Sequence, residues 1–162
     1  WLPIHVRWTE GVVAVWRAED LPLVPIWEIH LIPEDQIRQM IAQGRGGAIV
    51  NVASVNGVIP GAFQGIYSIT KAAVISMTKA FAKEAAASNI RVNALLPGAT
   101  ETKFASALTQ NPAILNELLK HVPMNRVAQP DEMAGAVLFL VSPAGSYTTG
   151  ACLNVDGGYL LV

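Results

Sequence analysis

Two short apolar runs, separated by a long helical stretch, constrain the fold of this chain most strongly. They are "GGAIVNVAS" (46–54) and "IRVNALLPG" (90–98), and both are apolar almost throughout. A strand with this pattern is buried on both faces, which is typical of parallel sheets. Parallel neighbours need a long crossover connection, usually a helix with a right-handed path. The two runs therefore predict a β-α-β unit.

The rest of the chain extends this pattern on both sides. The other predicted elements are helices over 32–44, 67–87, 112–121 and 129–142 and a last strand over 150–159. Pro33 and two acidic residues favour a helix start, and Gly44 favours its end. From residue 46 onward the order is β-α-β-α-α-β. This order predicts an α/β fold with a doubly wound parallel sheet.

The helix predicted over 67–87 is apolar on nearly all sides. Its charged residues are Lys71, Lys79, Lys83 and Glu84. A helix of this kind is covered on two sides. We expect the sheet to cover one side and another subunit the other, and the apolar C-terminus "GYLLV" adds surface for self-association.

The composition excludes several classes of function. Apolar residues make up 52% and charged residues 14%, with a net charge of −1, so we expect a globular chain without a basic patch for nucleic acid. Apolar runs such as "MAGAVLFLV" (133–141) are too short to cross a membrane. The single cysteine, Cys152, fits a reducing compartment, so we expect the cytoplasm. One cysteine and three dispersed histidines predict no metal site.

The composition changes near residue 33. All four tryptophans lie before that position, where no hydrophobic period persists, although "GVVAVW" (11–16) could form a short strand. We therefore divide the chain into an atypical segment, 1–33, and one domain, 34–162. A divergent N-terminus, a cloning artefact and a misread frame are three open explanations for the first segment.

Polar residues fall where the two buried strands end. Ser54 follows the first strand, and the residues from Pro97 to Thr102 follow the second. Tyr67 opens the connecting helix, and Lys71 lies four positions later on the same helix face. Ligands of open parallel sheets bind beyond the carboxyl ends of the strands. We therefore expect these residues to share one site.

A tyrosine, a lysine and a serine at such a place suit proton transfer. A phenol has a pKa of about 10, and a nearby ammonium favours its phenolate form. The tyrosine then becomes a usable proton donor and acceptor, while the serine hydroxyl holds the reacting oxygen. Each feature alone has a structural explanation, since a lone Y-x-x-x-K is common and serine or Pro-Gly after a strand is usually a turn. Their conjunction in this order favours a catalytic site.

Four ordered motifs carry a family resemblance. They are "GGAIVNVAS", "YSITK", "IRVNALLPGATET" and "NRVAQPDEMAGAVLFLVSPAGSYTTGACLNVDGGY". In order and spacing they closely resemble the C-terminal part of short-chain dehydrogenases/reductases, over about residues 38–160. The resemblance implies a partial Rossmann-like fold, a homodimer or homotetramer, and an oxidoreductase that uses NAD or NADP. Its substrate would be a small secondary alcohol or carbonyl compound.

The resemblance also implies a role for each matching residue. Tyr67 would be the general acid/base, Ser54 would orient and polarise the carbonyl, and Lys71 would support the tyrosine and bind the nicotinamide ribose. The cofactor-binding positions implied by the family pattern are Tyr67, Lys71, Pro97, Gly98, Thr100 and Thr102. Asn51 and Asn93 match polar strand positions with a structural role. Residues 103–125 correspond to the variable segment that closes over substrate.

The sequence departs from the family pattern at its N-terminal side. The glycine-rich T-G-x-x-x-G-x-G turn, which receives the cofactor pyrophosphate at a helix N-terminus, is absent from this sequence. In "WEIHL" (27–31), His30 stands where the family often has a catalytic asparagine, but the gap to Ser54 is several residues too short. These departures favour an alternative: a catalytically inactive fragment with only an oligomerisation or binding role.

Overall fold

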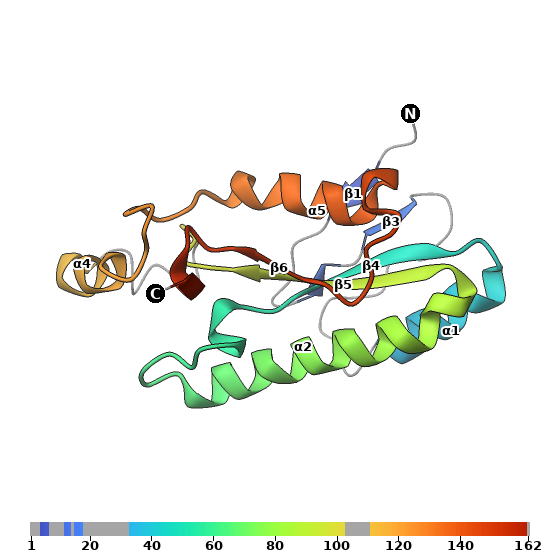
Figure 1. The fold of residues 1–162 in the computed structure, drawn as a ribbon, viewed down its shortest axis with the longest axis horizontal. Coiled ribbons are helices and arrows are strands. Elements are labelled where there is room, and N and C mark those ends of the chain that lie inside the picture. Colours follow the sequence, from blue (N-terminus) through green and yellow to red (C-terminus); the bar gives the residue numbers. More distant parts are fainter. Residues whose placement is uncertain (1–3, 7–11, 14, 18–32, 103–110, 162) are drawn as a thin grey trace.

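A four-stranded sheet lies between helices on its two faces in the computed structural model, which describes residues 4–6, 12–13, 15–17, 33–102 and 111–161 (Figure 1). The strands, in spatial order, are β2 (Val12–Val13), β4 (Gly47–Val52), β5 (Ile90–Pro97) and β6 (Cys152–Val155). The last three are parallel to one another. The predicted β-α-β unit and the α/β fold are confirmed.

The edge of this sheet differs from the prediction. Strand β2 runs antiparallel to β4, opposite Val50 and Asn51. The single strand expected over 11–16 is two strands, because β3 (Val15–Arg17) pairs instead with β1 (Ile4–Val6) in a separate antiparallel sheet. Strands this short carry no periodic signal, so their pairing partners decide where they begin and end.

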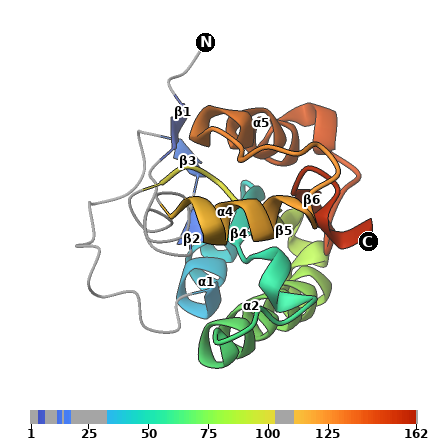
Figure 2. The same ribbon diagram turned by 90° about the vertical axis from the view of Figure 1, so that its left-hand side faces the viewer.

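Helices α1 (Pro33–Gln43) and α2 (Gly65–Ala85) cover one face of the sheet, and α5 (Ala134–Val141) covers the other (Figure 2). The sheet is therefore doubly wound, as predicted. Helix α1 begins at Pro33 and is followed by Gly44 at a φ of +67°, a left-handed conformation that favours glycine at a helix end.

Helix α2 begins two residues before its predicted start and is covered on one side within this chain. Its buried residues are Ser68, Thr78, Ala82 and Ala85. Ile66 and Ile69 lie away from the sheet and remain 82% and 70% exposed. The second cover expected for this helix is therefore not supplied by the described part of this chain.

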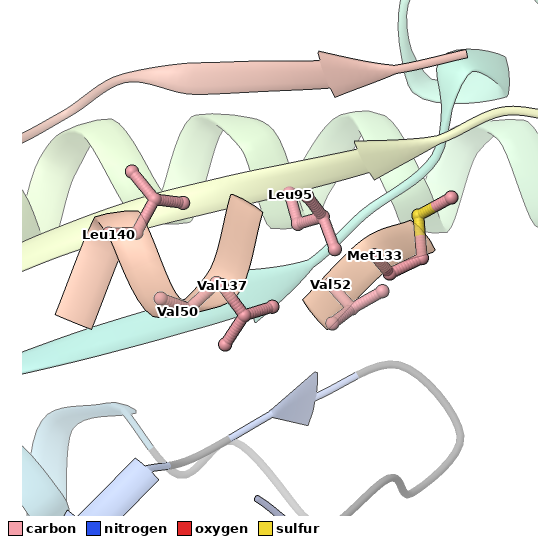
Figure 3. Packing of buried hydrophobic residues seen from close by; sticks show 6 residues of the cluster. All are labelled: Val50, Val52, Leu95, Met133, Val137 and Leu140. Atoms are coloured by element: carbon pink, nitrogen blue, oxygen red, sulfur yellow. The ribbon is translucent and has the colours of Figure 1, made fainter. Parts of the chain in front are cut away.

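An apolar cluster packs between the sheet and α5 (Figure 3). It consists of Val50, Val52 and Leu95 from the strands and Met133, Val137 and Leu140 from the helical side. Because side chains alternate along a strand, Ile49 and Ala53 point to the α2 side, where they pack in two further clusters. The predicted helix over 129–142 starts as a 3₁₀ turn, η4 (Pro130–Met133).

Helix α4 (Pro112–Leu119) lies at the end of the sheet that carries the strands' carboxyl ends (Figure 1). Asn111 caps it by accepting bonds from the backbone N–H groups of Ala113 and Ile114. The chain ends at the same side, in a 3₁₀ turn, η6 (Tyr159–Leu161). None of the helices in the described ranges has the length and apolar character needed to cross a membrane.

Candidate active site

Ser54 lies directly beyond the carboxyl end of β4. It caps the 3₁₀ helix η2 (Val55–Gly57), and its Oγ accepts a hydrogen bond from the backbone N–H of Asn56 at 3.1 Å. The side chain is buried. A hydroxyl can donate its hydrogen while it accepts a bond, so this cap leaves Ser54 able to donate to a substrate oxygen.

Tyr67 and Lys71 lie on one face of α2, in its first two turns. The Nζ atom of Lys71 is 5.5 Å from the centroid of the Tyr67 ring, within the range of a cation–π contact. Tyr67 is half-buried. The predicted i, i+4 arrangement is present, and it places a positive charge beside the phenol.

Lys71 also joins α2 to the end of β4. Its Nζ donates a hydrogen bond to the backbone carbonyl oxygen of Val52 at 3.1 Å. Burial lowers the pKa of the Lys71 ammonium from its usual value. The lysine therefore reaches the strand end only two residues before Ser54, and the helix and strand parts of the site meet there.

The other four cofactor-binding positions implied by the family pattern lie at the end of β5 and just after it, at the same edge of the sheet. Gly98 donates from its N–H to the Val155 carbonyl at 3.0 Å, and an added Cβ would lie 2.7 Å from the Cα of Asp156. Thr100 is buried, and its Oγ1 donates to the Gly98 carbonyl at 3.1 Å. Gly98 and Thr100 thus also have local packing roles, while Pro97 and Thr102 are half-buried.

The two strand asparagines make the structural bonds expected of them. Asn93 donates to the Thr148 carbonyl at 2.9 Å and accepts from the Ala151 N–H at 3.0 Å. Asn51 donates from Nδ2 to Thr78 Oγ1 at 2.9 Å, which links β4 to α2.

Two features of the site were not predicted from the sequence. An open hollow on the surface lies beside Tyr67. Its lining residues are Phe63, Gln64, Gly65, Ile66 and Tyr67. The second feature is the Val52 carbonyl as the partner of Lys71. A backbone acceptor leaves no trace in the sequence. The apolar residues Phe63 and Ile66 before Tyr67 can be read from the sequence, but their exposure is seen only in the structure.

Some sequence-based expectations lie outside the described residues. His30 and residues 103–110 of the variable segment belong to that part of the chain. Among the described residues, no group of histidine, cysteine, aspartate and glutamate side chains could hold a metal ion.

A family model described as "Enoyl-(Acyl carrier protein) reductase" matches residues 34–160. The chain belongs to the short-chain dehydrogenase/reductase family. The match includes all the positions singled out above from Ser54 to Thr102. Membership agrees with the doubly wound sheet and with a site at the carboxyl ends of its strands.

Individual relatives of this short-chain dehydrogenase/reductase support the same assignment. The chain is 45% identical over 122 residues to the 3-oxoacyl-[acyl-carrier-protein] reductase FabG of Chlamydia trachomatis, covering 75% of this chain and 48% of that protein. It is 45% identical over 124 residues to galactitol 2-dehydrogenase (L-tagatose-forming) of Cereibacter sphaeroides, with the same coverage. The chain thus spans about half the length of these relatives.

The solved structures agree with the fold. A gluconate 5-dehydrogenase from Burkholderia cenocepacia, in complex with NADP and tartrate, matches with a TM-score of 0.75 and 38% identity. The match covers 77% of this chain and 49% of that one. The described fold therefore corresponds to about half of such an enzyme.

Proposed function

We propose that this chain carries the catalytic part of an NAD(P)-dependent oxidoreductase that interconverts a small secondary alcohol and its ketone. One observation carries the proposal. Lys71 contacts the ring of Tyr67 and the end of β4 together, and Ser54 follows that strand end. Relatives named as reductases and dehydrogenases support the reaction class.

The proposed roles follow from the chemistry of the three side chains. In the reducing direction, Tyr67 donates its phenolic proton to the carbonyl oxygen of the substrate, and solvent returns a proton to the phenolate. Ser54 donates a hydrogen bond to the same oxygen, where negative charge develops. The Lys71 ammonium stabilises the phenolate by its charge. A bound nicotinamide cofactor supplies the hydride to the carbonyl carbon.

The described residues fit the nicotinamide end of such a cofactor. The Lys71 ammonium offers donors for ribose hydroxyls at the carboxyl end of β4, where ligands of open α/β sheets bind. The related gluconate 5-dehydrogenase contains NADP, so we propose NAD or NADP for this chain. Its contacts here would come from Tyr67, Lys71, Pro97, Gly98, Thr100 and Thr102.

We also propose that the chain works as a homodimer or homotetramer in the cytoplasm. The outward side of α2 carries Ile66 and Ile69, both largely exposed, and a second copy of the chain would cover them. The single cysteine, Cys152, is free, as suits a reducing compartment. Light scattering tests the assembly, since a folded monomer would contradict it.

A second proposed function requires no catalysis. We propose as the alternative a catalytically inactive chain with only an oligomerisation or binding role, for which the exposed Ile66 and Ile69 on α2 would supply the surface. Isothermal titration with NADH and NADPH separates the two proposals. The oxidoreductase requires binding of at least one of them. No heat at millimolar cofactor would exclude a working dehydrogenase formed by this chain alone.

A further inference from the structure

We propose that Gly57 is a positioning residue that sets how closely Ser54 approaches the Tyr67–Lys71 face of α2. Gly57 is the last residue of η2, the 3₁₀ helix that Ser54 caps. It touches neither substrate nor cofactor in this proposal, and it acts through the serine. The inference rests on the proposed function, because it assigns a role within the same site.

Gly57 lies directly against the backbone of α2. A Cβ added at this position would lie 2.8 Å from the carbonyl carbon of Lys71 and 2.9 Å from its oxygen. Carbon atoms in contact normally stay about 3.5–4.0 Å apart. The φ of Gly57 is not in the left-handed region, so its backbone conformation does not require glycine. The close approach to Lys71 is what excludes a side chain here.

The helix cannot easily move away to make room. Two adjacent residues of β4 hold it, since Asn51 donates to Thr78 Oγ1 and the Val52 carbonyl accepts from Lys71. Lys71 and Thr78 are seven residues apart, which is about 10 Å or two turns along a helix. Thr78 is fully buried and its Oγ1 also donates to the Val74 carbonyl at 2.8 Å.

The displacement caused by a methyl group at Gly57 therefore falls on η2. The Ile75 Cδ1 atom, 2.9 Å from the added Cβ, can rotate away, but the Lys71 backbone cannot. Ser54 moves with η2 because it is the cap of that turn. In the proposed mechanism, the hydroxyls of Ser54 and Tyr67 both bind the same substrate oxygen. A misplacement of about 1 Å can lower the rate about 100-fold.

The test compares Gly57→Ala with Gly135→Ala in the whole chain. Gly135 lies in α5, where an added Cβ meets nothing within 4 Å. We expect Gly57→Ala to lower kcat for ketone reduction by about tenfold or more while KM and the NADPH Kd stay within about twofold. Gly135→Ala should match the wild type in all three. A folded Gly57→Ala enzyme with wild-type kcat would overturn the proposal.

A structural measurement separates this proposal from the proposed function. If the wild type neither binds nor oxidises NADPH or NADH, the oxidoreductase proposal fails. Crystal structures of the wild type and Gly57→Ala still test the positioning. We expect the Ser54 Oγ atom to move away from α2 while β4 and α2 superpose. An unmoved Ser54 would refute the role of Gly57.

A second pair of variants covers the case in which Gly57→Ala does not fold. Thr78→Val removes the hydroxyl that binds Asn51, and Thr78→Ser keeps it. We expect Thr78→Val to shift α2 on β4 and lower kcat, and Thr78→Ser to restore kcat. If Thr78→Val leaves both kcat and the distance between Ser54 and Lys71 unchanged, the spacing is not controlled as proposed.

Discussion

The two faces of the sheet are packed in different ways. On the α5 face, Val50, Val52 and Leu95 pack in an apolar cluster, and the polar contact from Arg91 to the Leu140 carbonyl lies near the amino end of β5. On the α2 face, the apolar clusters are interrupted by specific polar contacts, from Asn51 to Thr78 and from Lys71 to the Val52 carbonyl. Apolar packing tolerates small shifts of a helix, whereas a buried hydrogen bond fixes position and direction. The contacts of α2 lie at the carboxyl end of β4, close to Ser54. We therefore infer that they set the geometry of the site, whereas the apolar cluster on the α5 face mainly supplies stability.

The largest expected effect separates the two faces by activity. Tyr67→Phe removes one hydroxyl at the α2 face and leaves the apolar clusters on both faces of the sheet intact. We expect ketone reduction to fall by about 100-fold or more, since general acid–base groups contribute about 10²–10⁴-fold. Thermal unfolding should change little. Steady-state kinetics and a melting curve on the same sample measure both, and an unchanged rate would contradict the role of Tyr67.

The next effect is on stability at the α5 face. Leu140 is fully buried, and Leu140→Ala should reduce the free energy of unfolding by about 2–5 kcal/mol. Leu138, on the same helix, is 55% exposed, so Leu138→Ala is the matched control and should cost less than about 1 kcal/mol. Urea denaturation measures both. Equal losses for the two variants would show that α5 is not packed as described.

The outward side of α2 gives a third test. Ile69→Glu places a charge on a surface that we propose is covered by a second copy of the chain. Desolvating that carboxylate in an interface would be costly, so we expect dimer dissociation to increase at least tenfold. Analytical ultracentrifugation over a concentration series measures the change. Glu117, already exposed on α4, gives a control in Glu117→Gln, whose association should match the wild type.

The smallest expected effect is a loss of folding stability at low pH, caused by protonation of Glu132 in η4, the turn before α5. The Arg126 guanidinium, and then the Gln129 N–H, lower the pKa of Glu132 to about 2 from the usual value of 4.5. The pKa of the folded state is thus below that of the unfolded state, so this contribution is complete above pH 4.5 and is lost as the pH falls towards 2. Wild type and Glu132→Gln should therefore differ in stability at pH 7 and converge near pH 2. A constant difference across that range would contradict the assignment.

Much of the fold could be predicted because its central strands carry a strong local signal. The runs over 46–54 and 90–98 are apolar almost throughout, and the helix between them lacks Gly and Pro in its interior. The short strands β2 and β3 could not be predicted, since two or three residues carry no period and their partners are distant in sequence. The one-sided cover of α2 also required the structure, because apolarity does not say which chain covers a surface.

The side chains of the candidate site could be predicted from the sequence, but the backbone contacts that hold them in place could not. Tyr67, Lys71 and Ser54 were predicted together because their types, spacing and places at the strand ends combine into one pattern, and the structure places Lys71 against the Tyr67 ring and the end of β4. The Val52 carbonyl that holds Lys71 is a backbone atom, so its sequence position says nothing about this use. Gly57 is informative only once the nearby backbone of α2 is known. Contacts between elements distant in sequence set both features.

The most direct test of the account is deuterium transfer from nicotinamide-deuterated NADPH or NADH to a panel of small ketones. Mass spectrometry of the alcohol products would detect the label after incubation with the whole chain, in wild-type form and as Tyr67→Phe. We predict labelled alcohol with the wild type and at least 100-fold less with Tyr67→Phe, in the range expected for a general acid. No label with the folded wild type, or equal label with both, would contradict the claim that these residues form a working catalytic site.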